Sequence, residues 1–130
     1  MCILLLIVIQ PTIALQIYEV YPNPIHDEGS GEYINLYTQK TIALEEYHLE
    51  TPSGNISLPH ETLYEGQYLL IAEEDFEKDN ESWPDADIVS PITLRNTEGY
   101  IKLWHNQEIE NMMQWKTSHE GKAISKNESR

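Results

Sequence analysis

The chain has 130 residues, the usual size of one domain that builds a single hydrophobic core. It contains 22 Asp and Glu residues but only 8 Lys and Arg residues, so its formal net charge at pH 7 is −14. This balance disfavours binding to nucleic acid and to anionic membrane surfaces, because both depend on clustered basic side chains. The single cysteine, Cys2, excludes a disulfide or a cysteine-based metal site within this chain.

The first segment resembles an export signal. Residues 3–9 are continuously apolar, and Pro11 and the small residue Ala14 follow them. This order is typical of the apolar region and cleavage zone of a signal peptide. We therefore expect residues 1–15 to be removed, by a cut after Ala14 or one or two residues later. The apolar run is too short to span a bilayer, which takes about 20 residues. The alternative interpretation is a buried first strand.

Residues 16–21 have the alternation of a first β-strand, with Tyr18 and Val20 expected on one face. The Pro-Asn-Pro run at residues 22–24 ends this strand, since proline cannot donate to a β-ladder. Residues 26–31 then have the polar and glycine-rich composition of a loop.

The clearest strand signal in the chain lies at residues 32–37. Ile34 and Leu36 fall on one face of this strand, and we expect both to point into the core. A charged residue at Ile34 should therefore unfold the domain. The opposite face carries Tyr33, Asn35 and Tyr37.

Short strands separated by turn residues continue to residue 115. Residues 42–44 are a short apolar patch, and strands are expected around 47–49, 56–58, 67–72, 88–94, 100–104 and 109–115. Turns are expected at 52–55, 96–99 and 105–107. The strand at 67–72 is the most apolar and should be central, whereas Pro91 suggests an edge. Seven to nine short strands without a long helical period predict an all-β fold, a two-sheet sandwich or small barrel.

Two segments do not fit the strand pattern. Residues 73–87 are acidic and irregular, with a possible helical turn at 73–78 and a loop pinned by Phe76 and Trp83. The chain is polar after the last predicted strand. We therefore place the folded domain at residues 16–118 and a polar tail or linker at 119–130.

In this order the segments resemble the lamin tail domain family. The matching pieces are Glu19-Val20, Asn23-Pro24, residues 31–37 (GEYINLY), residues 47–49, residues 66–72, residues 94–103, residues 109–115, and Gly121 with Ser125. Together they cover residues 17–125. The departures from the family pattern include Tyr33 in place of Trp, Asn35 in place of Glu, Glu98-Gly99 in place of Gly-Asp and Asn111 in place of Asp.

The resemblance implies an immunoglobulin-like β-sandwich without catalytic residues. Domains of this kind in bacteria and archaea occur in exported proteins, often beside nucleases or other hydrolases. The apparent export signal points to this prokaryotic type. On this reading the chain would be an interaction or tethering module outside the cell or at its surface.

Catalytic patterns are weak in this sequence. A Gly-x-Ser-x-Gly nucleophile motif is absent, and with 22 carboxylates some chance pairs are expected to be close. The five histidines do not follow a zinc-binding spacing and are expected at surface or loop positions. They are His26, His48, His60, His105 and His119.

Calcium is the better metal candidate, because it takes oxygen ligands from loops. Oxygen ligands could come from Asp27-Glu28, and the better candidates are Asp75, Asp79, Asp85 and Asp87. An EF-hand loop starting at Asp79 fails, since Pro84 stands where glycine is required. The alternative is a solvated acidic loop.

Other surface features suggest weaker sites. Three Asn-x-Ser sequons make Asn55, Asn80 and Asn127 candidates for glycosylation. Four aromatic residues at predicted outward strand positions could form a binding face: Tyr33, Tyr37, Tyr100 and Trp104. The alternative for these aromatics is ordinary β-propensity on a partly covered sheet.

The sequence leads to one preferred function and two alternatives. The preferred function is a non-catalytic exported interaction module of lamin-tail type, accessory to a hydrolase or nuclease, with a protein or cell-envelope component as its partner. We expect no bound cofactor, no direct contact with nucleic acid and no membrane span after signal removal. The first alternative is an extracellular module that binds glycan or a calcium-bridged ligand. The second is an enzyme, which would need an acid–base pair clustered in a pocket.

Overall fold

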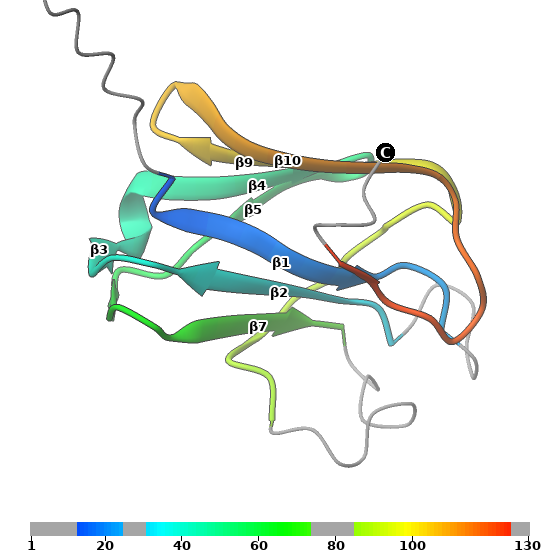
Figure 1. Cartoon of the computed structure of the whole chain (residues 1–130), viewed down its shortest axis with the longest axis horizontal. Coiled ribbons are helices and arrows are strands. Elements are labelled where there is room, and N and C mark those ends of the chain that lie inside the picture. The colour runs from blue at the N-terminus through cyan, green and yellow to red at the C-terminus, as the bar shows by residue number, and fades with distance from the viewer. Residues whose placement is uncertain (1–12, 25–30, 74–84, 126–130) are drawn as a thin grey trace, which may run out of the picture.

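The computed structural model describes residues 13–24, 31–73 and 85–125 (Figure 1). The described strands are β1 (Leu15–Tyr21), β2 (Tyr33–Thr38), β3 (Ile42–Ala43), β4 (Tyr47–Thr51), β5 (Gly54–Ser57), β6 (Thr62–Leu63), β7 (Tyr68–Ala72), β8 (Ile88–Val89), β9 (Thr97–His105), β10 (Glu108–Thr117) and β11 (Ile124–Ser125). One 3-10 turn, η1 (Leu44–Glu46), precedes β4. None of the helical structure in the described residues has the length and apolar character needed to cross a membrane.

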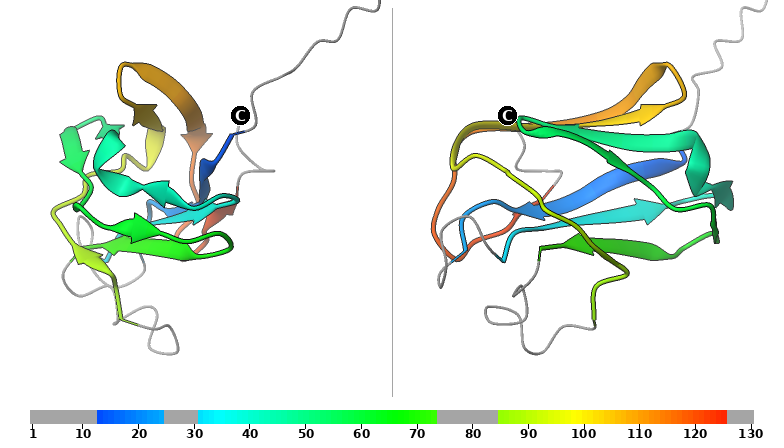
Figure 2. Two further views of the ribbon diagram at one scale, coloured as in Figure 1. Left: turned by 90° about the vertical axis from the view of Figure 1, so that its left-hand side faces the viewer. Right: turned by 180° about the vertical axis from the view of Figure 1, so that it is seen from behind.

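The strands form a two-layer sandwich, which confirms the predicted all-β sandwich fold. One sheet has the order β11-β1-β2-β7-β8 and the other β10-β9-β4-β5, and β3 pairs with β6 in a small ladder. The two layers lie one above the other in Figures 1 and 2. Every strand pair in the described residues is antiparallel except β7 with β8. Seven strands have four or more residues, and the remaining four have two each.

The core lies between the two sheets and follows the predicted alternation. Ile34 and Leu36 of β2 are fully buried, as expected from the sequence. The opposite sheet contributes inward side chains from β4, β9 and β10, among them Leu49, Ile101, Leu103, Met113 and Trp115. Strand β7 has a neighbouring strand on each side, as predicted, and β8 lies at the sheet edge just before Pro91. Residues 90–95 are not in a strand, so the extended segment predicted at 88–94 is shorter than expected.

The prediction that Tyr18 and Val20 share one face of the first strand is wrong. Ile17 and Val20 are both fully buried, whereas Tyr18 is exposed. The register of β1 against β2 shifts between Ile17 and Glu19, which is a β-bulge at Tyr18. An extra residue in one strand reverses the alternation locally and turns its side chain outward.

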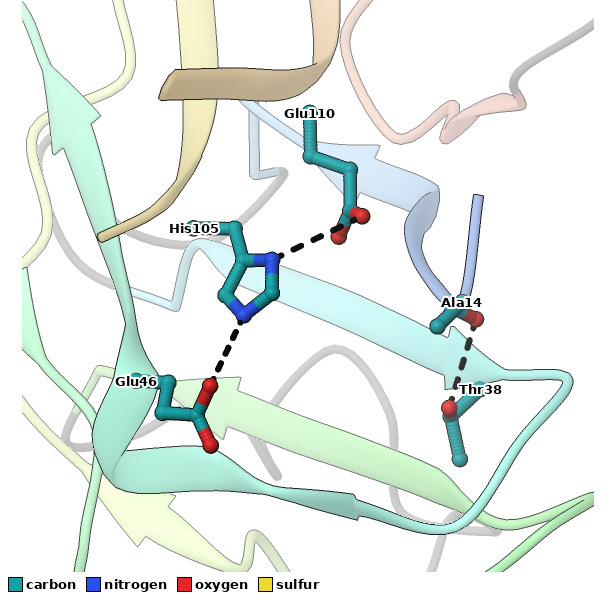
Figure 3. A network of polar contacts seen from close by, with 5 residues as sticks. All are labelled: Ala14, Thr38, Glu46, His105 and Glu110. Carbon is teal, nitrogen blue, oxygen red and sulfur yellow. Dashed lines mark hydrogen bonds and ion pairs between the residues drawn. The ribbon is translucent and has the colours of Figure 1, made fainter. Parts of the chain in front are cut away.

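The N-terminal boundary predicted at residue 15 falls inside β1. Leu15 is fully buried and pairs with Thr38. The carbonyl oxygen of Ala14 accepts hydrogen bonds from the Gln39 N–H (2.8 Å) and the Thr38 hydroxyl (3.2 Å; Figure 3). A cut after Ala14 or one or two residues later, as expected from the sequence, would remove the Ala14 contacts from the fold. Residues 1–12, the rest of the predicted signal, lie outside the described residues.

The C-terminal part also differs from the prediction. Strand β9 begins at Thr97, so the turn expected at 96–99 is largely strand. Strand β11 pairs with Glu19 and Val20 of β1, so the sandwich extends to Ser125, beyond the predicted boundary at 118. A two-residue strand has too little alternation to be recognised from sequence. The expected turn at 105–107 is present, with Asn106 in a left-handed conformation (φ 54°).

Candidate functional site

The most exposed aromatic cluster of the described residues lies on the outer face of the five-stranded sheet. It consists of Tyr18, Tyr37 and Tyr68, which we call the tyrosine surface. The ring centroids of Tyr37 and Tyr68 are 4.9 Å apart, and those of Tyr18 and Tyr68 are 5.2 Å apart in an edge-to-face arrangement. The Tyr18 and Tyr37 centroids are separated by 6.4 Å. Tyr18 is 38% exposed and Tyr68 is 49% exposed, so the cluster presents aromatic area to solvent.

The strand register explains how three tyrosines meet. Tyr37 of β2 lies directly opposite Tyr68 of β7, and such cross-strand neighbours are close enough for aromatic contact. In a regular strand Tyr18 would point into the core with Val20, which lies two positions later; the register shift between Ile17 and Glu19 lets Ile17 and Val20 both face inward and leaves Tyr18 on the outer face. Bulges of this kind are frequent at functional sites. The bulge therefore adds the third ring to a pair that the regular ladder already provides.

Polar groups continue the outer face beyond the tyrosine surface. Glu19 and Asn35 are paired in the register of β1 and β2, and both are half-buried. The pKa of the Tyr68 hydroxyl is raised by partial burial first, and by Tyr18, Tyr37 and the charge of Glu19. The Tyr68 hydroxyl therefore stays protonated at physiological pH, and the Glu19 carboxylate shares the outer face of this sheet with the ring cluster.

Tyr33, one of the predicted exposed aromatics, is buried. Its ring is 2% exposed and stacks on Tyr21 at a centroid distance of 5.2 Å. The Tyr33 hydroxyl donates a hydrogen bond to Glu19 Oε1 (3.0 Å). Ala86 and Ala123 pack against this second, smaller cluster. The outer face of the sheet is therefore covered around Tyr21 and Tyr33. Burial and the neighbouring Glu19 raise the pKa of Tyr33 well above its usual value.

The other predicted aromatics, Tyr100 and Trp104, lie on the outer face of the four-stranded sheet with partners from their own sheet. The Lys102 ammonium lies 5.4 Å from the Tyr100 ring centroid and 3.8 Å from a carboxylate oxygen of Glu50. The Trp104 indole donates to Glu50 Oε1 (3.2 Å) and stacks on His48, with an interplanar angle of 3°. These contacts occupy much of the polar and aromatic surface of both residues. Tyr37 is thus the only one of the four predicted aromatics that belongs to the tyrosine surface.

His105 forms a polar network beside the turn of the β9–β10 hairpin (Figure 3). Its Nε2 lies 3.0 Å from Glu46 Oε1 of η1, and its Nδ1 lies 3.8 Å from Glu110 Oε1 of β10. The imidazole also stacks on Tyr47, with centroids 4.3 Å apart. Both ring nitrogens are therefore directed at carboxylates from the protein itself. The network joins the hairpin to η1 and β4. The position of His105 in the sequence did not indicate this structural role.

One polar depression comes nearest to the pocket that an enzyme would need. It has a volume of about 480 Å³, and its lining includes Glu45, Glu46, His48 and His60. Glu46 is already bonded to His105, and His48 is stacked on Trp104. The Glu46 carboxylate of this depression is thus engaged in a contact within the sandwich.

Two buried carboxylates, Glu32 and Glu73, were not singled out by the sequence. Glu32 Oε2 accepts the Leu94 N–H and Glu73 Oε1 accepts the Ile92 N–H, each at 3.0 Å. Burial raises the pKa of Glu32 to about 8. The hydrogen bond from the Leu94 N–H lowers this pKa, and the negative charge of Glu73 raises it further. Burial also raises the pKa of Glu73. These side chains fasten the crossover at residues 90–95 to the ends of β2 and β7.

The two calcium candidates in the described part of the chain, Asp85 and Asp87, are not part of a metal-binding cluster. Asp87 Oδ2 accepts the Leu70 N–H (2.8 Å), and Asp85 is exposed. Among the described residues, no group of three or more His, Cys, Asp or Glu side chains is placed to hold a metal ion. Asn55 is exposed on β5, as a glycosylation candidate requires. Several predicted residues lie outside the described ones: Asp27, Glu28, Asp75, Asp79, Asn80, Asn127, His26, Phe76, Trp83 and residues 74–78 of the helical turn expected at 73–78.

Comparison with known proteins adds no family: no protein-family model matches the chain, and no curated protein matches it significantly. The site must therefore be judged from its own geometry. Alternation with the inward-facing Leu69 and Ile71 could have placed Tyr68 on the outward face of its strand, but not opposite Tyr37, because that pairing is a long-range feature. The sequence could not have indicated Tyr18, because a bulge leaves no simple mark in the alternation.

Proposed function

We propose that this domain is a non-catalytic interaction module of lamin-tail type, exported to the cell surface or beyond, which tethers or targets a neighbouring hydrolase or nuclease. Its partner, a protein or another component of the cell envelope, docks on the tyrosine surface. The observation that carries this proposal is the bulge that turns Tyr18 outward beside Tyr37 and Tyr68. The order of lamin-tail-like segments along the chain and the sandwich fold support it.

Tyrosines suit a binding surface for physical reasons. Each ring offers a large apolar area with only two rotatable bonds, so little conformational entropy is lost on binding. Each hydroxyl supplies a hydrogen-bonding group at the rim of that area. Aromatic residues are accordingly enriched in protein interfaces. An exposed cluster of three tyrosines contributes little to the core of the sandwich, which favours an interaction role.

A second candidate function is recognition of a glycan by the same surface. The observation that favours it is the position of Gln16, Glu19 and Asn35 on the strands around the three rings. Sugar rings stack on aromatic faces while their hydroxyl groups bond to neighbouring amides and carboxylates. A calcium-bridged form of this function is tested by melting the protein with calcium and with EDTA. Equal melting temperatures would rule that form out, because a ligand of the folded state must raise the melting temperature.

A panel of defined probes tests the proposed function. The full chain is titrated with a cationic peptide, a proline-rich peptide, cello-oligosaccharide and chito-oligosaccharide. Two-dimensional NMR follows the ring signals of the tyrosines, and chromatography follows each probe. We expect at least one probe to shift the signals of Tyr18, Tyr37 and Tyr68 without being cleaved. Shifts confined to other residues, or cleavage of a probe, would contradict the proposal.

A further inference from the structure

We propose that the tyrosine surface binds a cationic segment of its partner, with an arginine or lysine side chain stacked on the exposed rings and paired with Glu19. This inference rests on the proposed function and names the chemistry of its ligand. It follows from the distribution of charge around the tyrosine surface and from a comparison between the two outer faces of the sandwich.

The sheet that carries the tyrosine surface has no basic residue of its own. The described strands β1, β2, β7, β8 and β11 contain no Lys or Arg. The basic residues in the described part of the chain are Lys40, Arg95, Lys102, Lys116 and Lys122. Glu19, by contrast, follows Tyr18 on β1 and lies opposite Asn35 of β2 on the outer face of this sheet. In a chain of net charge −14 this face is therefore aromatic and negative.

The opposite outer face shows the same chemistry with the cation already present. There Lys102 lies over the Tyr100 ring at 5.4 Å and pairs with Glu50 at 3.8 Å. A tyrosine ring and a carboxylate from the same sheet thus both contact one cation on this face. The tyrosine surface has the first two of these groups, the exposed rings and the carboxylate of Glu19, although Tyr68 and Glu19 lie on β7 and β1 with β2 between them. The missing group is the cation, and a partner can supply it.

The energetics favour a cation over a neutral ligand at this position. A guanidinium or ammonium group over the face of a tyrosine is attracted by the negative charge density of that face. Arginine is better suited than lysine, because its planar, weakly hydrated group stacks on a ring while donating to a carboxylate. The Glu19 carboxylate can accept several hydrogen bonds, and the Tyr33 hydroxyl provides one. Long-range attraction from the acidic domain would also speed the encounter.

The test compares two peptides that differ only in charge. The full chain is titrated with acetylated tetra-arginine amide and with the corresponding tetra-citrulline peptide, which has a similar shape without the positive charge. Calorimetry measures affinity, and NMR locates the bound peptide. We expect the arginine peptide to shift the signals of Tyr18, Tyr37 and Tyr68, and the citrulline peptide to bind at least 5-fold more weakly.

Matched variants separate a specific site from general attraction to an acidic protein. Tyr68→Ser removes an exposed ring, and Glu19→Gln removes the charge while keeping an acceptor for Tyr33. Each should weaken binding of the arginine peptide by about 2- to 5-fold, the range expected for one exposed cation–π contact. Tyr64→Ser is the control, because Tyr64 is 59% exposed in the turn before β7 and lies outside the tyrosine surface. Amide spectra verify that each variant is folded.

The outcomes distinguish this inference from the proposed function. Equal affinity for the two peptides, or equal losses in Tyr68→Ser and Tyr64→Ser, would overturn the cationic ligand. If an oligosaccharide or the proline-rich peptide then shifts the tyrosine signals, the interaction module remains supported with a neutral ligand. If none of the probes affects these signals, the interaction function at this surface is contradicted as well.

Discussion

The indole of Trp115 lies against the backbone of Gly99, its register partner across the β9–β10 ladder. A Cβ atom at residue 99 would overlap three atoms of the indole ring. Trp115 is held in place, because its Nε1 donates to the Arg95 carbonyl oxygen at 2.7 Å. Gly99 is therefore required for space at this point of the core, within a strand where glycine is otherwise unfavourable.

The first prediction follows from this contact. Gly99→Ala should lower the free energy of unfolding by about 2–3 kcal/mol, the usual cost of overpacking a core. Urea denaturation measures the change, and Ser57→Ala, an exposed strand position, serves as the control with an effect within about 0.5 kcal/mol. In the double variant Gly99→Ala/Trp115→Leu the two losses should not add, because the smaller side chain leaves room for the methyl group. Full additivity would show that the two residues do not interact as described.

The second prediction concerns the buried carboxyl of Glu32, which is 3% exposed. Its pKa is about 8 in the folded state, against an ordinary value of 4.5. Between these pH values the folded state holds a proton that the unfolded chain has released, so stability falls as pH rises through this window. The loss of stability contributed by Glu32 should be up to about 5 kcal/mol at pH 9. Urea denaturation at intervals from pH 4 to pH 9 measures it.

Two variants isolate this contribution from the general repulsion in an acidic chain. Glu32→Gln keeps an oxygen for the Leu94 N–H but cannot ionise, so its stability should depend less on pH than that of the unaltered protein. Glu61→Gln removes one exposed carboxylate and is matched in charge. Its curve should run parallel to that of the unaltered protein. If both variants gave parallel curves, Glu32 would not be the group that titrates.

Much of the fold follows from local pattern, and the errors have specific physical causes. The alternation around Ile34 and Leu36 identified a core strand, because burial of one sheet face imposes a period of two. The same rule failed at Tyr18, where an extra residue changes the period without changing the composition. It also missed β11, where two residues pair with β1 at the end of a polar segment.

The candidate site was harder to predict than the fold. Tyr37 was identified, but the tyrosine surface depends on pairing β2 with β7 and on the bulge in β1. Both are long-range features that a single sequence does not determine. The same holds for Tyr33, whose burial depends on Ala86 and Ala123 from distant segments. Outward alternation alone therefore overestimates exposure.

The third prediction tests the strand on which the core was first recognised. Ile34→Asp places a carboxylate between the two sheets, where ionised groups are very unfavourable without a partner. The variant should be insoluble or unfolded by circular dichroism. Ile34→Val is the matched control and should cost only about 0.5–1.5 kcal/mol. A soluble and fully folded Ile34→Asp protein would be incompatible with the position of β2.

The fourth prediction concerns Asn111, which connects the bulge to the opposite sheet. Its Oδ1 accepts the Ile17 N–H at 2.9 Å, one residue before Tyr18, so it satisfies a backbone donor beside the bulge. Asn111→Ala leaves this donor unpaired and should cost about 1–3 kcal/mol. Asn111→Asp keeps an acceptor in the same place and should retain most of the stability.

The same pair of variants links the bulge to binding. Loss of the Asn111 contact should loosen the bulge and broaden the NMR signals of the Tyr18 ring. Affinity for a ligand of the tyrosine surface should then fall in Asn111→Ala and be largely preserved in Asn111→Asp, although residue 111 lies on the other sheet. Equal effects of the two variants on stability and on Tyr18 would show that the Ile17 N–H does not depend on this acceptor. The orientation of Tyr18 would then be set by contacts within its own sheet.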